Sequence, residues 1–166
     1  MEIRSAETFV PYFESVRART RRVALAIPRE QLEWSPREGV FSPGDLLRHI
    51  AGTERYMFAE NACCRPSRYP GHGRELADGY DEVFAYFDRL HEESLAILRA
   101  LTPDDLESRC TTVGGAAISV AKWLRAMVEH EVHHRGQLYS LLGLLGVPAP
   151  SLYGLTEAEV LANSVP

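Results

Sequence analysis

The chain is poor in cysteine and has no long apolar stretch. Its three cysteines are Cys63, Cys64 and Cys110, an odd number of which two are adjacent. This pattern argues against a disulfide framework and suits free thiols in a reducing compartment. No segment approaches the ~20 consecutive apolar residues that cross a bilayer, and the first residues have no apolar signal core. We therefore expect a cytoplasmic protein that does not insert into membranes.

Basic residues are also scarce relative to acidic ones. The chain has 18 lysines and arginines against 23 aspartates and glutamates, for a net charge of −5. This balance disfavours nucleic acid and anionic membrane surfaces as partners. The one dense basic run comprises Arg17, Arg19, Arg21 and Arg22. At helical spacing these side chains spread around the helix, so we interpret them as a solvated face; a patch that binds nucleic acid is the less favoured alternative.

Strand-like alternation, internal repeats and low-complexity tracts are absent from the sequence. A length of 166 residues fits one domain of ordinary size, and we expect a single domain over residues 1–166. Because 45% of the residues are hydrophobic, the chain can close an apolar core without disulfide bonds.

Apolar residues recur instead at the three- and four-residue steps of amphipathic helices. Four segments follow this pattern: 9–27, 42–58, 78–101 and 119–145. We expect the second helix to begin with Ser42 as its cap and Pro43 in its first turn. The apolar stripe of this helix comprises Leu46, Ile50, Thr53 and Met57, with Phe58 beside it.

The segments between these helices have the composition of loops. Residues 65–73 are rich in glycine and proline, and residues 111–117 are too short and glycine-rich to form a sheet. Thr156 and Glu159 match a capping box, which predicts a short C-terminal helix. The expected fold class is therefore all-α, a four-helix bundle.

Segment 129–137, EHEVHHRGQ, carries the most informative polar residues. His130 and His134 are four positions apart, so on a helix their Cβ atoms lie on one face about 5–6 Å apart. They interrupt the apolar stripe between Met127 and Leu138, where core residues are expected. Two buried imidazoles cost free energy unless each has a partner, and one divalent metal ion serves both. The alternative, two hydrogen-bonded core histidines, is less favoured for a stacked pair.

A metal ion that keeps a position open for chemistry needs a third protein ligand, and His49 is the best candidate. It lies on the second predicted helix, beside the apolar stripe. We interpret His72, in a loop, and His91, on the third helix, as surface or boundary residues. His133 is displaced from the His134 direction by one residue's rotation; we interpret it as a supporting or interface group that could substitute for His130.

Three neutral imidazoles would leave a divalent ion with its full charge. Such an ion is a Lewis acid that lowers the pKa of bound water or binds a thiolate. The ligand set suits Zn, Ni, Cu or Fe. Asp45, one turn before His49, and Glu131, one turn before His134, are placed to orient the rings. For both carboxylates an ordinary solvated charge is the favoured interpretation.

A metalloprotease is a remote alternative. Residues 130–134, HEVHH, match the H-E-x-x-H pattern in which the glutamate is the general base. The extended form of that motif is absent, because Gln137 stands where a glycine is required. No strand is predicted that would hold a peptide substrate.

Two segments carry a resemblance to a known family. Residues 130–137, with the pattern H-x-x-x-H-R-G-Q, and the leucine-rich run to Pro148 resemble the last helix of the DinB/YfiT-like superfamily. Residues 41–50, FSPGDLLRHI, are similar to the second helix of these proteins, where their first metal-binding histidine lies. The similarity covers nearly the whole chain, although only the two histidine segments are specific.

The resemblance implies an up-down-down-up four-helix bundle with a metal site at His49, His130 and His134. It also implies Zn or Ni as the usual metal and a homodimer. Characterised relatives include metal-dependent S-transferases and isomerases that use low-molecular-weight thiols such as bacillithiol or mycothiol. A metal-dependent S-transferase or hydrolase acting on a small molecule is therefore expected. The alternative is a non-catalytic, stress-responsive metal-binding protein, because the fold does not fix the reaction.

Overall fold

Short polar side chains cap the starts of three of the four long helices of this chain. In the computed structural model, which describes residues 3–165, these helices are α1 (Ala6–Ala24), α2 (Pro43–Thr53), α4 (Tyr80–Arg99) and α6 (Val120–Leu144). The Ser42 hydroxyl accepts from the Asp45 amide, and the Ser42 amide donates in return to the Asp45 carboxylate. Ser5 and Ser119 accept in the same way at the starts of α1 and α6. Each cap satisfies an amide that has no partner inside the helix.

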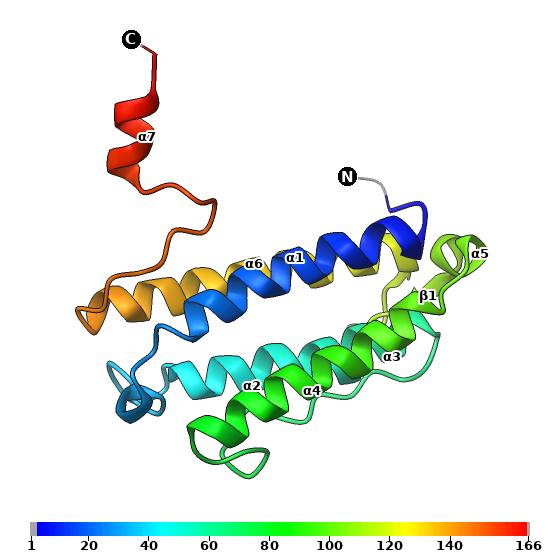
Figure 1. Ribbon diagram of the computed structural model, residues 1–166. Helices are drawn as coiled ribbons and strands as arrows, with labels where there is room; N and C mark the ends of the chain where they lie inside the picture. Colours follow the sequence, from blue (N-terminus) through cyan, green and yellow to red (C-terminus); the bar gives the residue numbers. More distant parts are fainter. Residues whose placement is uncertain (1–2, 166) are drawn as a thin grey trace.

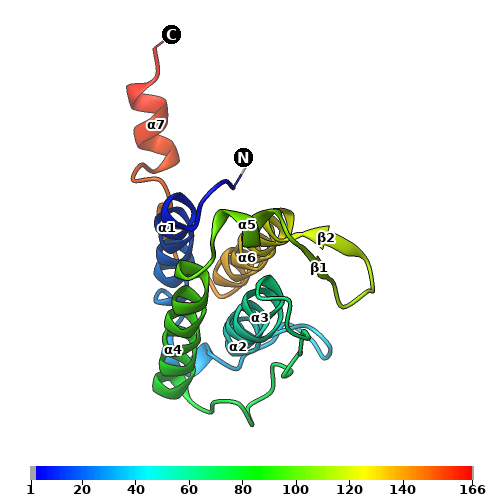
Figure 2. The same cartoon turned by 90° about the vertical axis from the view of Figure 1, so that its right-hand side faces the viewer.

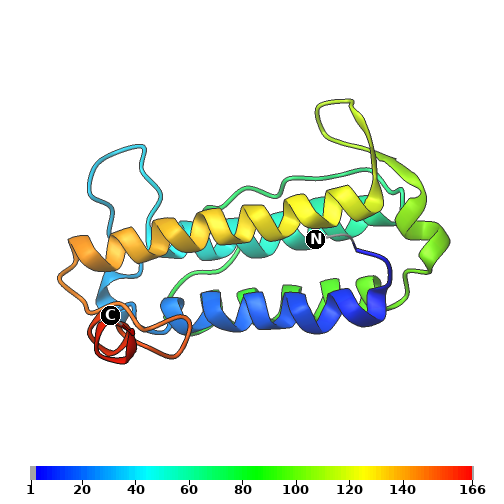
Figure 3. The same ribbon diagram turned by 90° about the horizontal axis from the view of Figure 1, so that it is seen from above.

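The four long helices form a bundle in which α1 and α2 each pack against both α4 and α6. Helices α1 and α6 run in one direction and α2 and α4 in the other (Figures 1 and 3). The directions therefore follow an up-down-down-up order, and segment 63–79 returns along the bundle so that α2 and α4 can be parallel. The expected all-α four-helix bundle is confirmed. Within residues 3–165 no helix combines the length and hydropathy that crossing a membrane requires.

Shorter elements connect or extend the long helices. They are η1 (Arg29–Gln31), η2 (Glu54–Ala59), α3 (Glu60–Ala62), α5 (Pro103–Glu107) and α7 (Glu157–Asn163). Helix α7 begins with the predicted capping box, in which Thr156 and Glu159 exchange hydrogen bonds. All residues of α7 are exposed, and the helix stands away from the bundle (Figure 2).

The segment between α5 and α6 forms an antiparallel hairpin of β1 (Arg109–Thr111) and β2 (Ala117–Ser119). The expectation that residues 111–117 form a loop without any sheet was therefore wrong at both ends of the segment. Three-residue strands are too short to show a two-residue alternation in sequence. The glycines lie in the turn, where Gly115 adopts a φ of +81°.

Helix α2 continues through η2, a turn of π-helix, into α3. A π turn holds about one residue more than an α turn, so the buried face shifts along the sequence. A strict α-helical period places Met57 on the buried stripe. In the structure Phe58 is 4% exposed, whereas Met57 is only partly buried. The π turn is thus the physical reason for this difference from the predicted stripe.

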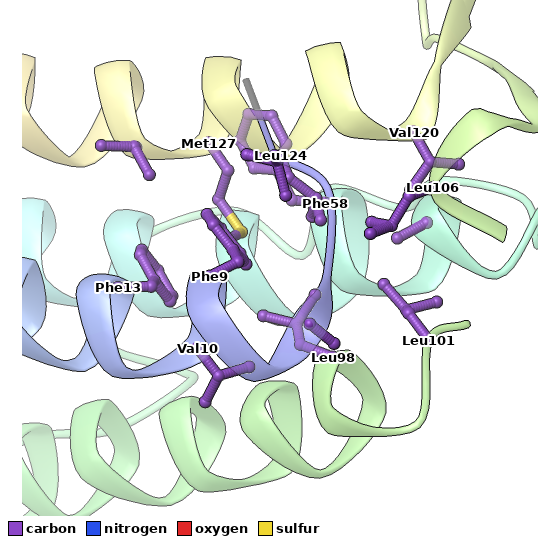
Figure 4. Close-up of a cluster of buried hydrophobic side chains, with 14 of the residues drawn as sticks. Phe9, Val10, Phe13, Phe58, Leu98, Leu101, Leu106, Val120, Leu124 and Met127 are labelled. Carbon is purple, nitrogen blue, oxygen red and sulfur yellow. The ribbon is translucent and has the colours of Figure 1, made fainter. Parts of the chain in front are cut away.

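The apolar core consists of two clusters, one at each end of the bundle. Figure 4 shows the cluster that joins the start of α1, the end of α4 and the start of α6 with Phe58. The other joins the opposite ends of these helices with α2. Between them every long helix contributes buried polar residues, which we call the polar layer: Arg17, Thr20, Thr53, Glu54, His91, Ser94, Glu131 and Arg135.

One arginine lies at the centre of the polar layer. The Arg17 guanidinium donates to Glu54, and a carboxylate oxygen of Glu131 lies 3.2 Å from Nη2 of Arg17. Nδ1 of His91 is 2.9 Å from the other oxygen of Glu54. The guanidinium also stacks over Phe87, with 4.1 Å between Cζ and the ring centroid. Contacts of this single cation therefore connect α1 to α4, to α6 and to η2, which continues α2.

Three interpretations made from the sequence were wrong for members of this layer. Glu131, for which an ordinary solvated charge is favoured from the sequence, is 2% exposed and faces Arg17. Arg17 belongs to the basic run interpreted as a solvated face, yet it is 3% exposed. Arg22 is exposed and Arg19 and Arg21 are partly exposed, as a solvated face requires. His91 was interpreted as a surface or boundary residue but is buried, and burial lowers its pKa to about 3. Hydropathy patterns miss these three residues because a buried ion network replaces apolar contacts here.

Replacing Arg17 with methionine should strongly destabilise the protein. The substitution fills similar volume but leaves Glu54 and Glu131 buried without their cation. Removing one partner of a buried ion pair costs about 3–5 kcal/mol of the free energy of unfolding. The measurement is urea unfolding of wild type and variant at neutral pH.

Arg21→Met is the matched control, one turn along the same helix. Arg21 pairs with Asp88 at 2.9 Å, but both side chains are more than 40% exposed. Solvent screening reduces the expected loss to about 0–1 kcal/mol. Similar losses in the two variants would contradict the central role of Arg17.

Candidate metal centre

Three histidine side chains from two helices converge where α2 and α6 pack together. Nε2 of His49 on α2 lies 3.0 Å from Nε2 of His130 and 3.1 Å from Nε2 of His134. The two α6 nitrogens are 3.1 Å apart. All three residues are partly buried. The structure therefore brings together the three histidines that the sequence singles out; that they bind a metal ion remains a prediction.

Helix α6 turns these histidines toward α2 by directing their neighbours into the core. Glu131 and Arg135 also stand four residues apart, and both are buried. Glu131 faces Arg17, and Arg135 donates to the Val16 carbonyl at 3.2 Å. His130 directly precedes Glu131, and His134 directly precedes Arg135. Because Glu131 and Arg135 are fixed inside the bundle, the helix turns both histidines toward α2. The polar layer and the histidine cluster thus occupy the same turns of α6.

Two imidazoles are oriented through their second nitrogen. Nδ1 of His134 lies 2.7 Å from Oε1 of Gln137, an acceptor, so Nδ1 carries the proton and Nε2 presents a lone pair. Nδ1 of His49 lies 2.9 Å from the Tyr69 hydroxyl. The same hydroxyl is 2.8 Å from Nδ1 of His72. The cluster is therefore supported by a helical amide and by the loop that precedes α4.

These supporting groups differ from the carboxylates considered in the sequence. Asp45 pairs with Arg48 and caps α2, and Glu131 faces Arg17. Gln137 could have been found, because it lies three residues after His134 on one helical face. Tyr69 carries no such signal, because its loop reaches His49 only through tertiary folding.

The other histidines lie outside the cluster. His133 is exposed, with Nε2 3.3 Å from Nε2 of Gln137. His72 is half-buried and stacks near Phe41, with 4.2 Å between ring centroids. His133 also meets the His134 ring edge-on, with 4.9 Å between ring centroids, but contributes no nitrogen to the cluster. His72 supports the cluster through the Tyr69 hydroxyl.

Aromatic rings surround the cluster and exclude part of the solvent. Phe41 meets His49 edge-on, with 5.6 Å between ring centroids. The ring centroids of Phe58 and His130 are 5.6 Å apart, and those of Trp123 and Phe58 are 4.5 Å apart. Phe58 reaches this position because the π turn of η2 shifts it onto the buried face.

Burial keeps the imidazoles neutral. It is the main cause that lowers the pKa of His49 to about 4 and that of His130 to about 3, with neighbouring histidines adding to the effect. Burial also lowers the pKa of His134, although its hydrogen bond to Gln137 acts in the opposite direction. All three are therefore in the form that ligates metals near pH 7.

The donor set fits a divalent metal ion. Nitrogens bound 2.0–2.1 Å from one tetrahedral ion would lie roughly 3.3 Å apart, close to the separations in this cluster. Three lone pairs that face one another also repel unless a cation or shared protons lie between them. Of the residues that the structure describes, the cluster contains only these three histidines, so an ion held by them would keep a coordination position for an external ligand.

The geometry does not support a metalloprotease. In that mechanism the glutamate of H-E-x-x-H must face the metal-bound water. Here Glu131 is 2% exposed and directed toward Arg17, on the core side of α6. The match to the motif follows from helical spacing alone.

The metal-free protein should lose stability as the pH is lowered from 6.5 to 5. His49, His91 and His130 stay neutral in the folded state, with pKa values of about 4, 3 and 3. In the unfolded chain they bind protons near pH ~6.5. The unfolded state therefore binds more protons in this window, and acid favours it. Urea midpoints measured with a chelator at several pH values test this.

His49→Gln should show a shallower pH dependence, because one histidine fewer takes up a proton on unfolding. A midpoint that stays constant between pH 6.5 and 5 in the wild type would contradict the assignment. The window ends at pH 5 because ordinary carboxylates begin to titrate below it.

Comparisons with known proteins agree with the fold. A family model described as the DinB superfamily matches residues 12–138. The chain is also 28% identical over 140 residues to the uncharacterized protein YjoA of Bacillus subtilis, covering 82% of this chain and 88% of YjoA.

Solved structures of DinB-like proteins share the fold. The YjoA structure has a TM-score of 0.68 and 23% identity, covering 87% of this chain and 96% of YjoA. A DinB-like protein from Bacillus cereus has a TM-score of 0.75 at 16% identity, covering 90% and 99%. YfiT from Bacillus subtilis, described as a probable metal-dependent hydrolase with an unusual four-helix bundle topology, has a TM-score of 0.64 at 18% identity, covering 86% and 89%.

The structural likeness establishes the fold, and the family model establishes the relationship. Its match includes His49, His130 and His134 and extends from α1 to the last turns of α6. The resemblance noted in the two histidine segments is thereby confirmed, and the chain belongs to the DinB superfamily.

Proposed function

We propose that this protein binds one divalent metal ion through His49, His130 and His134 and is a thiol-dependent S-transferase. The observation that carries the proposal is the convergence of three neutral imidazoles within 3.1 Å of one another. Zn and Ni are the metals we favour, because imidazole nitrogens suit both. A divalent ion held there supplies Lewis-acid chemistry, lowering the pKa of a thiol or water that binds beside the histidines.

The protein's own residues prepare the site for such a ligand. Tyr69 and Gln137 fix the His49 and His134 rings, so little reorganisation is needed when a ligand arrives. Phe41 and Phe58 pack beside the rings and limit access of water. A lower local dielectric strengthens interactions with a charged thiolate.

The nucleophilic thiol is expected to come from outside the chain. Burial raises the pKa of the Cys63 and Cys110 thiols, which disfavours their thiolate forms. Cys64 is exposed, and its Sγ lies 3.7 Å from the Arg109 carbonyl, in the hairpin region. A low-molecular-weight thiol such as bacillithiol or mycothiol would fill this role. These free cysteines are consistent with our placement of the protein in the cytoplasm.

A hydrolase is the second candidate, supported by the description of YfiT as a probable metal-dependent hydrolase. The same open position would then hold water instead of a thiol. A non-catalytic, stress-responsive metal-binding protein is the third. Formation of a homodimer stays a prediction that follows from the family.

The first prediction of the proposal concerns metal content. Purified protein loaded with Zn or Ni should hold one ion per chain, and His130→Ala or His134→Ala should remain folded but bind the ion weakly. Each variant removes one of three ligands. Metal analysis after dialysis, with circular dichroism to check folding, measures the effect.

His133→Ala is the control for these variants. It removes an exposed histidine from the same helix that meets the His134 ring edge-on but contributes no nitrogen to the cluster. Its metal content should equal that of the wild type. If His130→Ala and His134→Ala also kept full metal content, the proposed site would be wrong.

The second prediction concerns the thiol. Protein loaded with cobalt(II) and titrated with bacillithiol, mycothiol or a simple analogue should develop a sulfur-to-cobalt charge-transfer band that saturates. The band should be absent in His130→Ala. A cobalt spectrum that does not change with any thiol tested would reject the S-transferase proposal in favour of the other two candidates.

A further inference from the structure

A groove lies beside the histidine cluster, between the last turns of α6 and the segment that precedes α2. Its volume is about 520 Å³, within the range of small-molecule sites. Figure 3 shows the segment between α1 and α2 projecting beside the C-terminal half of α6. The residues that line the groove are Pro36, Gly39, Val40, Phe41, Leu46, His134, Gln137, Ser140, Leu141 and Leu144.

The groove wall carries no formal charge. Among the described residues that line it there is no Asp, Glu, Lys or Arg, although 25% of the whole chain is charged. Its one amide side chain and its one hydroxyl side chain already have hydrogen-bond partners. Gln137 bonds to His134 and His133, and Ser140 donates to the Gly136 carbonyl. An occupant therefore meets mainly carbon, and burying a charge there would be unfavourable.

The groove also explains an exposed apolar side chain. Leu144 is 66% exposed on the last turn of α6, where a polar residue is expected on a solvated face. Val40, from the segment before α2, lines the same groove. Both side chains are placed to cover an apolar molecule that lies between them.

His134, one of the three clustered histidines, lines one end of the groove. His134 is the first α6 residue along the groove and Leu144 the last, so the groove extends about 15 Å, from ten residues at 1.5 Å each. Phe41 contacts His49 and lines the groove as well. A ligand bound next to His134 could therefore continue along the apolar wall.

We propose that this groove binds the uncharged alkyl or aryl tail of the substrate whose reacting group is held at the histidine cluster. The inference rests on the metal centre of the proposed function and adds the class of substrate: an electrophile with a long apolar tail. The tail leaves water as it enters the groove, which favours long over short substrates. A charged tail would lose hydration without gaining a partner.

Alkyl hydroxamates test the groove because their head group binds metal ions and their tail can be lengthened. Acetohydroxamate, hexanohydroxamate and decanohydroxamate are titrated by calorimetry into the zinc-loaded protein, whose metal content is measured first. Each added methylene that enters the groove should tighten binding by about fourfold. A hydroxamate of matched length that ends in a carboxylate should bind no better than acetohydroxamate.

Two variants locate the tail. Leu144→Glu places a charge at the far end of the groove. It should weaken the binding of decanohydroxamate at least tenfold and leave the affinity for acetohydroxamate unchanged. Val132→Glu makes the matched change at another exposed position of α6, 42% exposed and outside the groove lining. It should leave every affinity as in the wild type.

The outcomes separate this inference from the proposed function. Acetohydroxamate binding without any gain from longer tails would overturn the groove assignment and leave the metal centre standing. Equal effects of Leu144→Glu and Val132→Glu would also overturn it. A protein that holds no zinc would remove the proposed function, and the inference with it.

Discussion

The buried ion pairs of Arg17 with Glu54 and Glu131 determine how the long helices align. An apolar core tolerates sliding of one helix along another, but a buried charge requires its partners at one height. Each apolar cluster therefore ends where the polar layer begins. Glu54 lies little more than one helical turn after His49, and Glu131 directly follows His130. The helix alignment that pairs these carboxylates with Arg17 therefore also places His49 opposite the two histidines of α6.

The site uses the bundle without disturbing its core. Helix α6 has two adjacent polar faces. One carries Glu131 and Arg135 and points into the bundle interior; the other carries His130 and His134 and faces α2. Burial then keeps the imidazoles neutral, which is the state that both metal ligation and an apolar neighbourhood favour. Structural charges and the clustered histidine nitrogens thus occupy the same turns of one helix, the first in the core and the second facing α2.

Much of this could be predicted from the sequence. Helical periods indicate the four long helices, Ser42 marks the start of the second, and a four-residue spacing places His130 above His134. Arg17 could not be placed, because a charged residue in an amphipathic helix gives no sign that its partners are buried. The π turn and the three-residue strands escape detection because each departs from the standard periods over too few residues. Tyr69 escapes because only the folded chain brings its loop to His49.

The return of segment 63–79 along the bundle has a consequence for how such proteins diverge. Two parallel consecutive helices require a long connection, and this one passes the histidine cluster and supplies Tyr69 and His72. Loops accept substitutions and insertions that packed helices reject. Changes in this segment can therefore alter the surroundings of the three histidines while the core stays intact, so relatives with the same bundle are free to acquire different chemistries.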